Sequence, residues 1–123
     1  MIAVAALAAC GHARADPANS GPYGAAYAGI CNAISAAKAD NAGRARTIFF
    51  NVSHQRIHEL AAATEPVERG IAARLLEAKQ RVEAEFLAAK PNTTLRADLV
   101  RLGVAMAKAM TVTAHVHPPT CPN

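Results

Sequence analysis

Two stretches of the chain repeat apolar residues at steps of three and four, and this period constrains the fold more than any other feature. The first stretch contains Val67, Ile71, Leu75, Ala78, Val82, Phe86 and Ala89. The second contains Leu95, Leu99, Leu102, Met106, Ala109 and Thr113. Because this spacing places side chains on one face of an α-helix, we expect two amphipathic helices. We expect the first to carry Pro66 in its opening turn, where proline is favoured, and to end at Lys90-Pro91.

Two earlier segments complete the expected fold. Residues 23–39 are rich in alanine, and residues 42–64 carry Ile48, Phe49, Val52, Ile57 and Leu60. Asp40-Asn41 and Gly43 mark a break between them. Sustained alternation and hairpin signals are absent from the sequence, and short connections favour antiparallel neighbours. We therefore predict an all-α domain over residues 25–123, an up-down-up-down four-helix bundle with a disulfide-stapled C-terminal tail.

The N-terminus reads as an export signal. Residues 1–9 are apolar, too few to span a bilayer as a helix, and Leu7-Ala8-Ala9-Cys10 resembles a bacterial lipobox. The resemblance implies that residues 1–9 are a signal-peptide remnant, that Cys10 is lipidated, and that residues 10–24 form a lipid anchor and flexible tether. Lipidated Cys10 would then anchor the protein to its membrane partner, the outer face of the cytoplasmic membrane.

Two other interpretations of this terminus stay open. Ala13-Arg14-Ala15, followed by Asp16-Pro17, resembles a signal peptidase I site of mycobacterial exported proteins, which implies secretion after cleavage following Ala15. The apolar run lacks the basic residues that usually precede such a core. It could therefore also be a buried segment of a cytoplasmic protein.

The cysteines favour export. With Cys10 acylated or removed, Cys31 and Cys121 remain, and an even pair in an exported chain predicts one disulfide. This bond would fasten the proline-rich tail to the first helix. A Cys-x-x-Cys motif is absent from the sequence, so a thiol-redox function is not expected.

The charge pattern argues against a nucleic-acid partner. The 13 Lys and Arg residues outnumber the 9 Asp and Glu residues, which gives a net charge of +4. The basic residues are scattered, and many have an acidic neighbour one helical turn away, such as Glu65 with Arg69 and Glu77 with Arg81. A nucleic-acid surface would cluster positive charge and add aromatic side chains, and the chain is only 4% aromatic.

The histidines are the candidate metal ligands. His54 and His58 lie four residues apart, about 40° around a helix, which lets two imidazoles reach one ion. His115 and His117 would lie at the same end of the bundle and could join them. Histidines alone suit zinc, nickel or copper, whereas sulfur from Met106 and Met110 would favour copper.

Other features weaken this metal site. The second and fourth helices of such a bundle are diagonal, and both His54 and His58 fall towards the flank or surface of their helix. Met106 lies on the apolar stripe, where methionine usually packs. Gln55, rather than glutamate, follows His54, so the sequence does not predict a zinc peptidase.

Signals for an enzyme or a haem protein are weak. A Gly-x-Ser-x-Gly motif is absent, and Ser53 and His54 point about 100° apart as helix neighbours. Glu83 and Glu85 are two residues apart, and residues at this spacing face away from each other on a helix. Tyr23 and Tyr27 lie one turn apart, but without a Cys-x-x-Cys-His motif they do not predict haem. We therefore predict a protein that is not an enzyme.

Residues 54–61 (HQRIHELA) and 72–83 (AARLLEAKQRVE) are similar to small exported lipoproteins of high-GC actinobacteria. The resemblance implies a cell-envelope protein and implies no activity. The leading hypothesis is a non-catalytic binding or interaction module with an envelope protein as its partner. The alternative is an extracytoplasmic copper or zinc protein that uses His54 and His58, and the third is an enzyme of another type.

Overall fold

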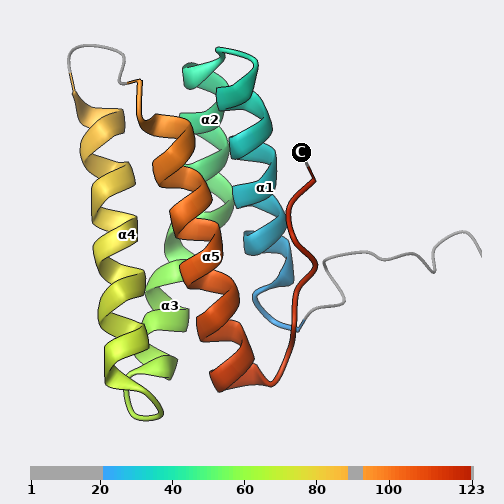
Figure 1. The fold of residues 1–123 in the computed structure, drawn as a ribbon, viewed down its shortest axis with the longest axis vertical. Helices are drawn as coiled ribbons and strands as arrows, with labels where there is room; N and C mark the ends of the chain where they lie inside the picture. The colour runs from blue at the N-terminus through green and yellow to red at the C-terminus, as the bar shows by residue number, and fades with distance from the viewer. Residues whose placement is uncertain (1–20, 89–92, 123) are drawn as a thin grey trace, which may run out of the picture.

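The computed structural model describes residues 21–88 and 93–122, and this part of the chain is all-helical, without strands (Figure 1). Its elements in chain order are α1 (Gly24–Lys38), α2 (Ala42–Ile48), the π-helix η3 (Phe49–Ser53), α3 (His54–Thr64), α4 (Arg69–Leu87) and α5 (Leu95–Ala114). The predicted all-α class is confirmed. The predictions for Cys10 and Ala15 fall on residues 1–20, outside the described residues.

The predicted break near residue 40 is present. Asp40 adopts a left-handed conformation with φ 58°, which turns the chain after α1. The Asn41 side chain then accepts a hydrogen bond of 3.0 Å from the backbone N–H of Arg44 and caps α2. Asp40 and Asn41 thus supply both the stop and the restart that the sequence indicated.

The segment expected as one helix over residues 42–64 contains a π-helical turn that was not predicted. Its buried residues Ala45, Phe49, Ser53 and Ile57 recur every four positions. On a regular α-helix each such step drifts by about 40°, so the buried face would turn away from the core. In η3 the backbone hydrogen bonds join residues five apart instead of four, so each residue turns the helix by a smaller angle. This wider turn compensates for the drift. The rod α2–η3–α3 therefore keeps one face on the core along its length.

The predicted start of the third helix is wrong. Pro66 lies in the turn before α4, which begins at Arg69. The Thr64 carbonyl accepts hydrogen bonds from Val67 N–H at 2.9 Å and Glu68 N–H at 2.8 Å. These bonds close the turn that contains Pro66, before α4 begins. Val67 is 54% exposed and does not belong to the apolar stripe, whereas Leu75, Val82 and Phe86 are buried as expected.

The core lies where the elements meet. α4 packs on α5 and α3, while α1 packs on α2, η3 and α5 (Figure 1). Met106 and Met110 are fully buried there, so they serve packing. α3 also touches α5, where the hydroxyls of Thr64 and Thr113 are 2.7 Å apart. The expectation that the second and fourth helical segments are not adjacent is therefore wrong at this end.

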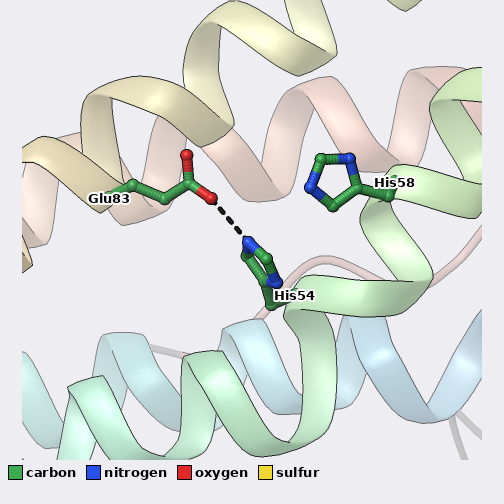
Figure 2. Close-up of side chains that lie close together, drawn as sticks. All are labelled: His54, His58 and Glu83. Carbon is green, nitrogen blue, oxygen red and sulfur yellow. Dashed lines mark hydrogen bonds and ion pairs between the residues drawn. The ribbon is translucent and has the colours of Figure 1, made fainter.

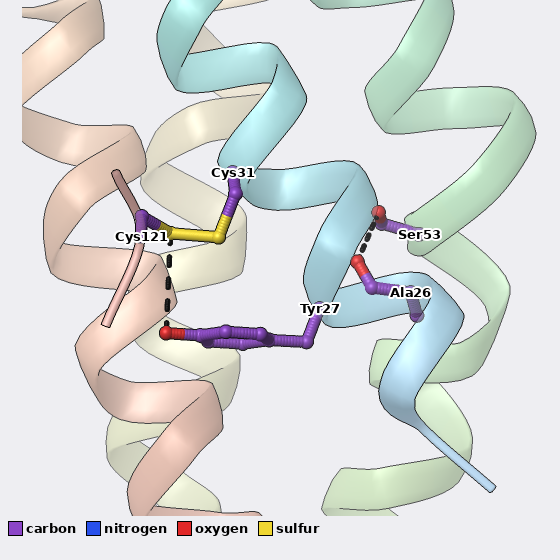
Figure 3. The surroundings of a disulfide bond; sticks show 5 residues. All are labelled: Ala26, Tyr27, Cys31, Ser53 and Cys121. Atoms are coloured by element: carbon purple, nitrogen blue, oxygen red, sulfur yellow. Dashed lines mark hydrogen bonds between the residues drawn. A yellow bond between two sulfur atoms is a disulfide. The ribbon is translucent and has the colours of Figure 1, made fainter. Parts of the chain in front are cut away.

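The C-terminal tail is fastened to α1. His115, with φ 57°, ends α5, and the chain returns to α1, where Cys121 forms the predicted disulfide with Cys31 (Figure 3). The Tyr27 hydroxyl lies 3.9 Å from Cys121 Sγ and is the donor, because a disulfide sulfur carries no proton. Burial raises the pKa of Tyr27. Among the described helices, none is long and apolar enough to cross a membrane.

Candidate metal centre

The π-turn fixes where the first candidate ligand, His54, leaves the rod. The Ser53 hydroxyl is fully buried and donates a 2.7 Å hydrogen bond to the Ala26 carbonyl of α1 (Figure 3). Gly29 permits this approach, because a Cβ at that position would lie 2.5 Å from Ser53 Oγ and 2.8 Å from Val52 Cγ1. The rod is therefore held against α1 at the residue directly before His54.

The His54 imidazole is held between aromatic rings and a carboxylate. Its ring centroid lies 5.6 Å from that of Phe49 and 5.3 Å from that of Phe50. Its Nε2 lies 2.6 Å from Oε2 of Glu83, on α4 (Figure 2). The His54 side chain is only 27% exposed, so these contacts leave it little freedom.

Glu83 connects His54 to a buried cation. The same oxygen, Oε2, accepts a 2.8 Å hydrogen bond from Nζ of Lys79, one turn earlier on α4. The Lys79 side chain is only 4% exposed, and a buried ammonium needs a counter-ion. Burial alone would raise the pKa of Glu83, but hydrogen bonds and charge from Lys79 and His54 outweigh it and lower that pKa. Glu83 is thus held as a carboxylate.

His58 completes the group from the exposed side of α3. Its ring centroid lies 4.9 Å from that of His54, with the two rings nearly perpendicular. Desolvation, then Coulombic interactions with Lys79 and His54, lower the pKa of His58, and the opposing charge of Glu83 does not reverse this. A lower pKa favours the neutral imidazole, the form that binds metals.

These three side chains fit a transition-metal ion. One ligand atom from each of His54, His58 and Glu83 lies within 4.8 Å of the others. Zinc–ligand bonds of about 2.0–2.1 Å in tetrahedral geometry place ligand atoms about 3.3 Å apart. The ligand atoms of the widest pair must therefore close by at most about 1.5 Å, which rotation of the exposed His58 ring can supply.

The four histidines predicted as ligands lie in two separate parts of the structure. His54 and His58 come together as predicted. His115 and His117 are exposed beyond the end of α5. Within residues 21–88 and 93–122, the one group of three or more close His, Cys, Asp or Glu ligands is His54, His58 and Glu83.

Glu83 was not predicted as a ligand, because on its own helix it was compared only with Glu85. A usable signal was present. Glu83 follows Val82 on the apolar stripe, so it lies at the edge of the buried face, and it is four residues after Lys79. A carboxylate at such an edge meets the neighbouring helix, which here is α3.

Comparisons with models of known protein families, with curated proteins and with solved structures find no match to this chain.

Proposed function

We propose that this chain is an exported, non-catalytic binding module whose ligand is a divalent transition-metal ion, zinc or copper. The observation that carries the proposal is the convergence of two imidazoles from α3 and one carboxylate from α4 within 4.8 Å. Imidazole nitrogen and carboxylate oxygen are common ligands of both ions. Water takes the remaining coordination position.

The geometry indicates how the ion enters. Because Glu83 is held as a carboxylate, His54 Nε2 donates the hydrogen bond between them, and a metal ion that bound this nitrogen would release its proton to solvent. A carboxylate offers about four lone-pair sites, so Glu83 can retain Lys79 while it binds the ion. Phe49 and Phe50 hold the His54 ring in place, so the rearrangement falls on His58, which must approach, and on Glu83, whose oxygen lies only 2.6 Å from His54 Nε2 and must move slightly away.

Export and anchoring form the second part of the proposal. The lipobox-like Leu7-Ala8-Ala9-Cys10 supports lipidation, and a disulfide is typical of proteins outside the cytoplasm. Intact mass of the exported protein tests this part. A diacylated Cys10 terminus supports the anchor, and an unmodified Asp16 terminus supports secretion instead.

We also propose that α1, the rod α2–η3–α3, α4 and α5 run up, down, up and down, as a four-helix bundle. Thr94, just before α5, donates a 3.2 Å hydrogen bond to Glu85 near the end of α4, which supports an antiparallel pair. The hydrogen-bonded Thr64 and Thr113 bring the ends of α3 and α5 together, as this arrangement requires. An experimental structure of the folded domain tests the order directly.

Calorimetric titration of the whole disulfide-bonded chain with Zn²⁺ and with Cu²⁺ tests the metal proposal. We expect one ion per chain, and at least a tenfold weaker Kd for His58→Ala and for Glu83→Gln. The double variant His115→Ala/His117→Ala is the matched control, because it removes two exposed imidazoles outside the group. A Kd for His58→Ala equal to that of the wild type, or a loss of binding in the control, would contradict the proposal.

A module without metal is the competing function, and the Lys79–Glu83 pair is the observation that favours it. In that case Glu83 serves only to neutralise a buried ammonium, and the ligand of the protein is an envelope partner. Thermal unfolding separates the two. A melting temperature that rises with Zn²⁺ concentration supports the metal site, whereas an unchanged melting temperature supports the competing function.

A further inference from the structure

A second region of the molecule combines positive charge with an apolar floor, away from the histidines. It is a groove of about 200 Å³ between α4 and α5. Its cationic side chains come from both helices and are Arg74, Arg81, Arg101 and Lys108. We call this feature the basic groove.

The charges of the basic groove are largely uncompensated. Arg101 pairs with Asp98 at 2.6 Å. Arg74, Arg81 and Lys108 form no ion pair or hydrogen bond with any described residue. Glu77 is the single acidic side chain among the described lining residues. Cations held around a low-dielectric floor concentrate positive potential, so the groove favours an anionic group.

The floor of the groove is apolar and includes exposed aliphatic surface. Ile71 and Ala105 are half-buried, and Val104 is 61% exposed. Long Arg and Lys side chains can cover such a floor while their charged ends stay at the rim. An occupant therefore gains from apolar contact along the floor as well as from charge at the rim.

The volume of the basic groove limits the size of the ligand that it can hold. Sites for drug-sized molecules enclose about 300–1,000 Å³, and this groove is smaller. A single alkyl segment fits that space, whereas a polycyclic ring system does not. We propose that the basic groove binds an anionic amphiphile, with its acidic headgroup on the arginines and part of its alkyl chain on the floor. This site is independent of the metal centre.

Titration of the whole chain with dodecanoate, below its micelle concentration, tests the proposal. We expect saturable binding, and at least a tenfold weaker Kd for Arg74→Gln/Arg81→Gln. Arg44→Gln/Arg56→Gln is the matched control, because it removes the same charge from exposed positions outside the groove and should leave Kd within about twofold. Equal weakening by both double variants would overturn the proposal, because it would show a general charge effect.

Two further arms test the apolar floor and the source of the ligand. Val104→Glu places a carboxylate in the groove at an exposed position that does not support the core, and it should abolish binding. Dodecyltrimethylammonium, with the same chain and the opposite charge, should not bind. Binding to vesicles of phosphatidylglycerol without any binding of dodecanoate monomer would overturn the proposal in favour of a membrane surface.

Discussion

Among the contacts that the rod α2–η3–α3 forms with neighbouring helices, those with α1 and with α4 are built in opposite ways. Against α1 the contact is made by small residues, with Gly29 beneath Ser53 and a hydroxyl donated to a backbone carbonyl. Against α4 the contact is made by charged and aromatic side chains, with His54, Glu83 and a buried Lys79. Ser53 and His54 are adjacent in sequence, yet one fixes the rod and the other carries the chemistry. Close backbone packing on one side of a helix can therefore position titratable groups on its other side.

The largest effect is expected from the disulfide, which holds the α1 side together. Replacing both Cys31 and Cys121 with alanine removes a cross-link across a separation of 90 residues. The chain-entropy model gives a loss of about 4–5 kcal/mol in the free energy of unfolding. Urea denaturation measures this loss. A loss below about 1 kcal/mol would mean that packing alone fastens the tail.

Gly29→Ala tests the close approach of α1 and η3. The added methyl overlaps Ser53 and Val52, so we expect the free energy of unfolding to fall by about 1–3 kcal/mol. Zn²⁺ affinity should fall as well, because η3 sets the position of His54.

Gly43→Ala is the matched control for that variant. A Cβ there meets only Asn41 Oδ1 at 3.9 Å, and the position is exposed in α2. Alanine in an exposed helix should raise the free energy of unfolding by up to about 1 kcal/mol. Equal effects of the two substitutions would show that the α1 contact tolerates a side chain.

Lys79→Met tests the charged contact. Removing the ammonium leaves Glu83 with His54 alone, so a divalent ion meets less repulsion. We expect a Kd for Zn²⁺ about tenfold tighter, which corresponds to about 1.4 kcal/mol. Calorimetry measures the change. A weaker Kd would mean that Lys79 positions Glu83 for the ion instead of competing with it.

The smallest effect is expected from acid. The pKa of Glu83 lies below its ordinary value of 4.5 in the folded protein, so its ion pairs stabilise the fold above about that pH. As pH falls through the lowered pKa, that stability is lost, by about 1 kcal/mol or less for a partly exposed pair. Unfolding free energies between pH 6 and pH 3 measure this loss, and Glu83→Gln should flatten the profile. An unchanged slope in the variant would assign the loss to other carboxylates.

Local sequence rules predicted much of the fold because they act within one helix. The stripe Leu75–Val82–Phe86 follows from spacing, and the restart at Asn41 follows from the residue types at the break. The Cys31–Cys121 pair was predicted differently, from the even number of cysteines left in an exported chain. The π-turn was missed because a four-residue repeat satisfies a helical pattern. The need for a wider turn appears only in the tertiary structure, where Ser53 must face α1.

The site was predictable only in part for a similar reason. The spacing of His54 and His58 is a property of one helix, and the structure places both together. Glu83 is 29 residues away from His54 and reaches it through the packing of α3 on α4. Sequence spacing does not determine which flanks of two helices meet, so the third ligand required the tertiary structure.

The anomalous scattering of zinc, in crystals of the protein grown with Zn²⁺, locates a bound ion without any assumption about its ligands. We predict one peak within about 2.0–2.2 Å of a nitrogen of His54, a nitrogen of His58 and an oxygen of Glu83. The absence of a peak between these side chains at saturating zinc, or a sole peak at His115 and His117, would contradict the proposed metal centre.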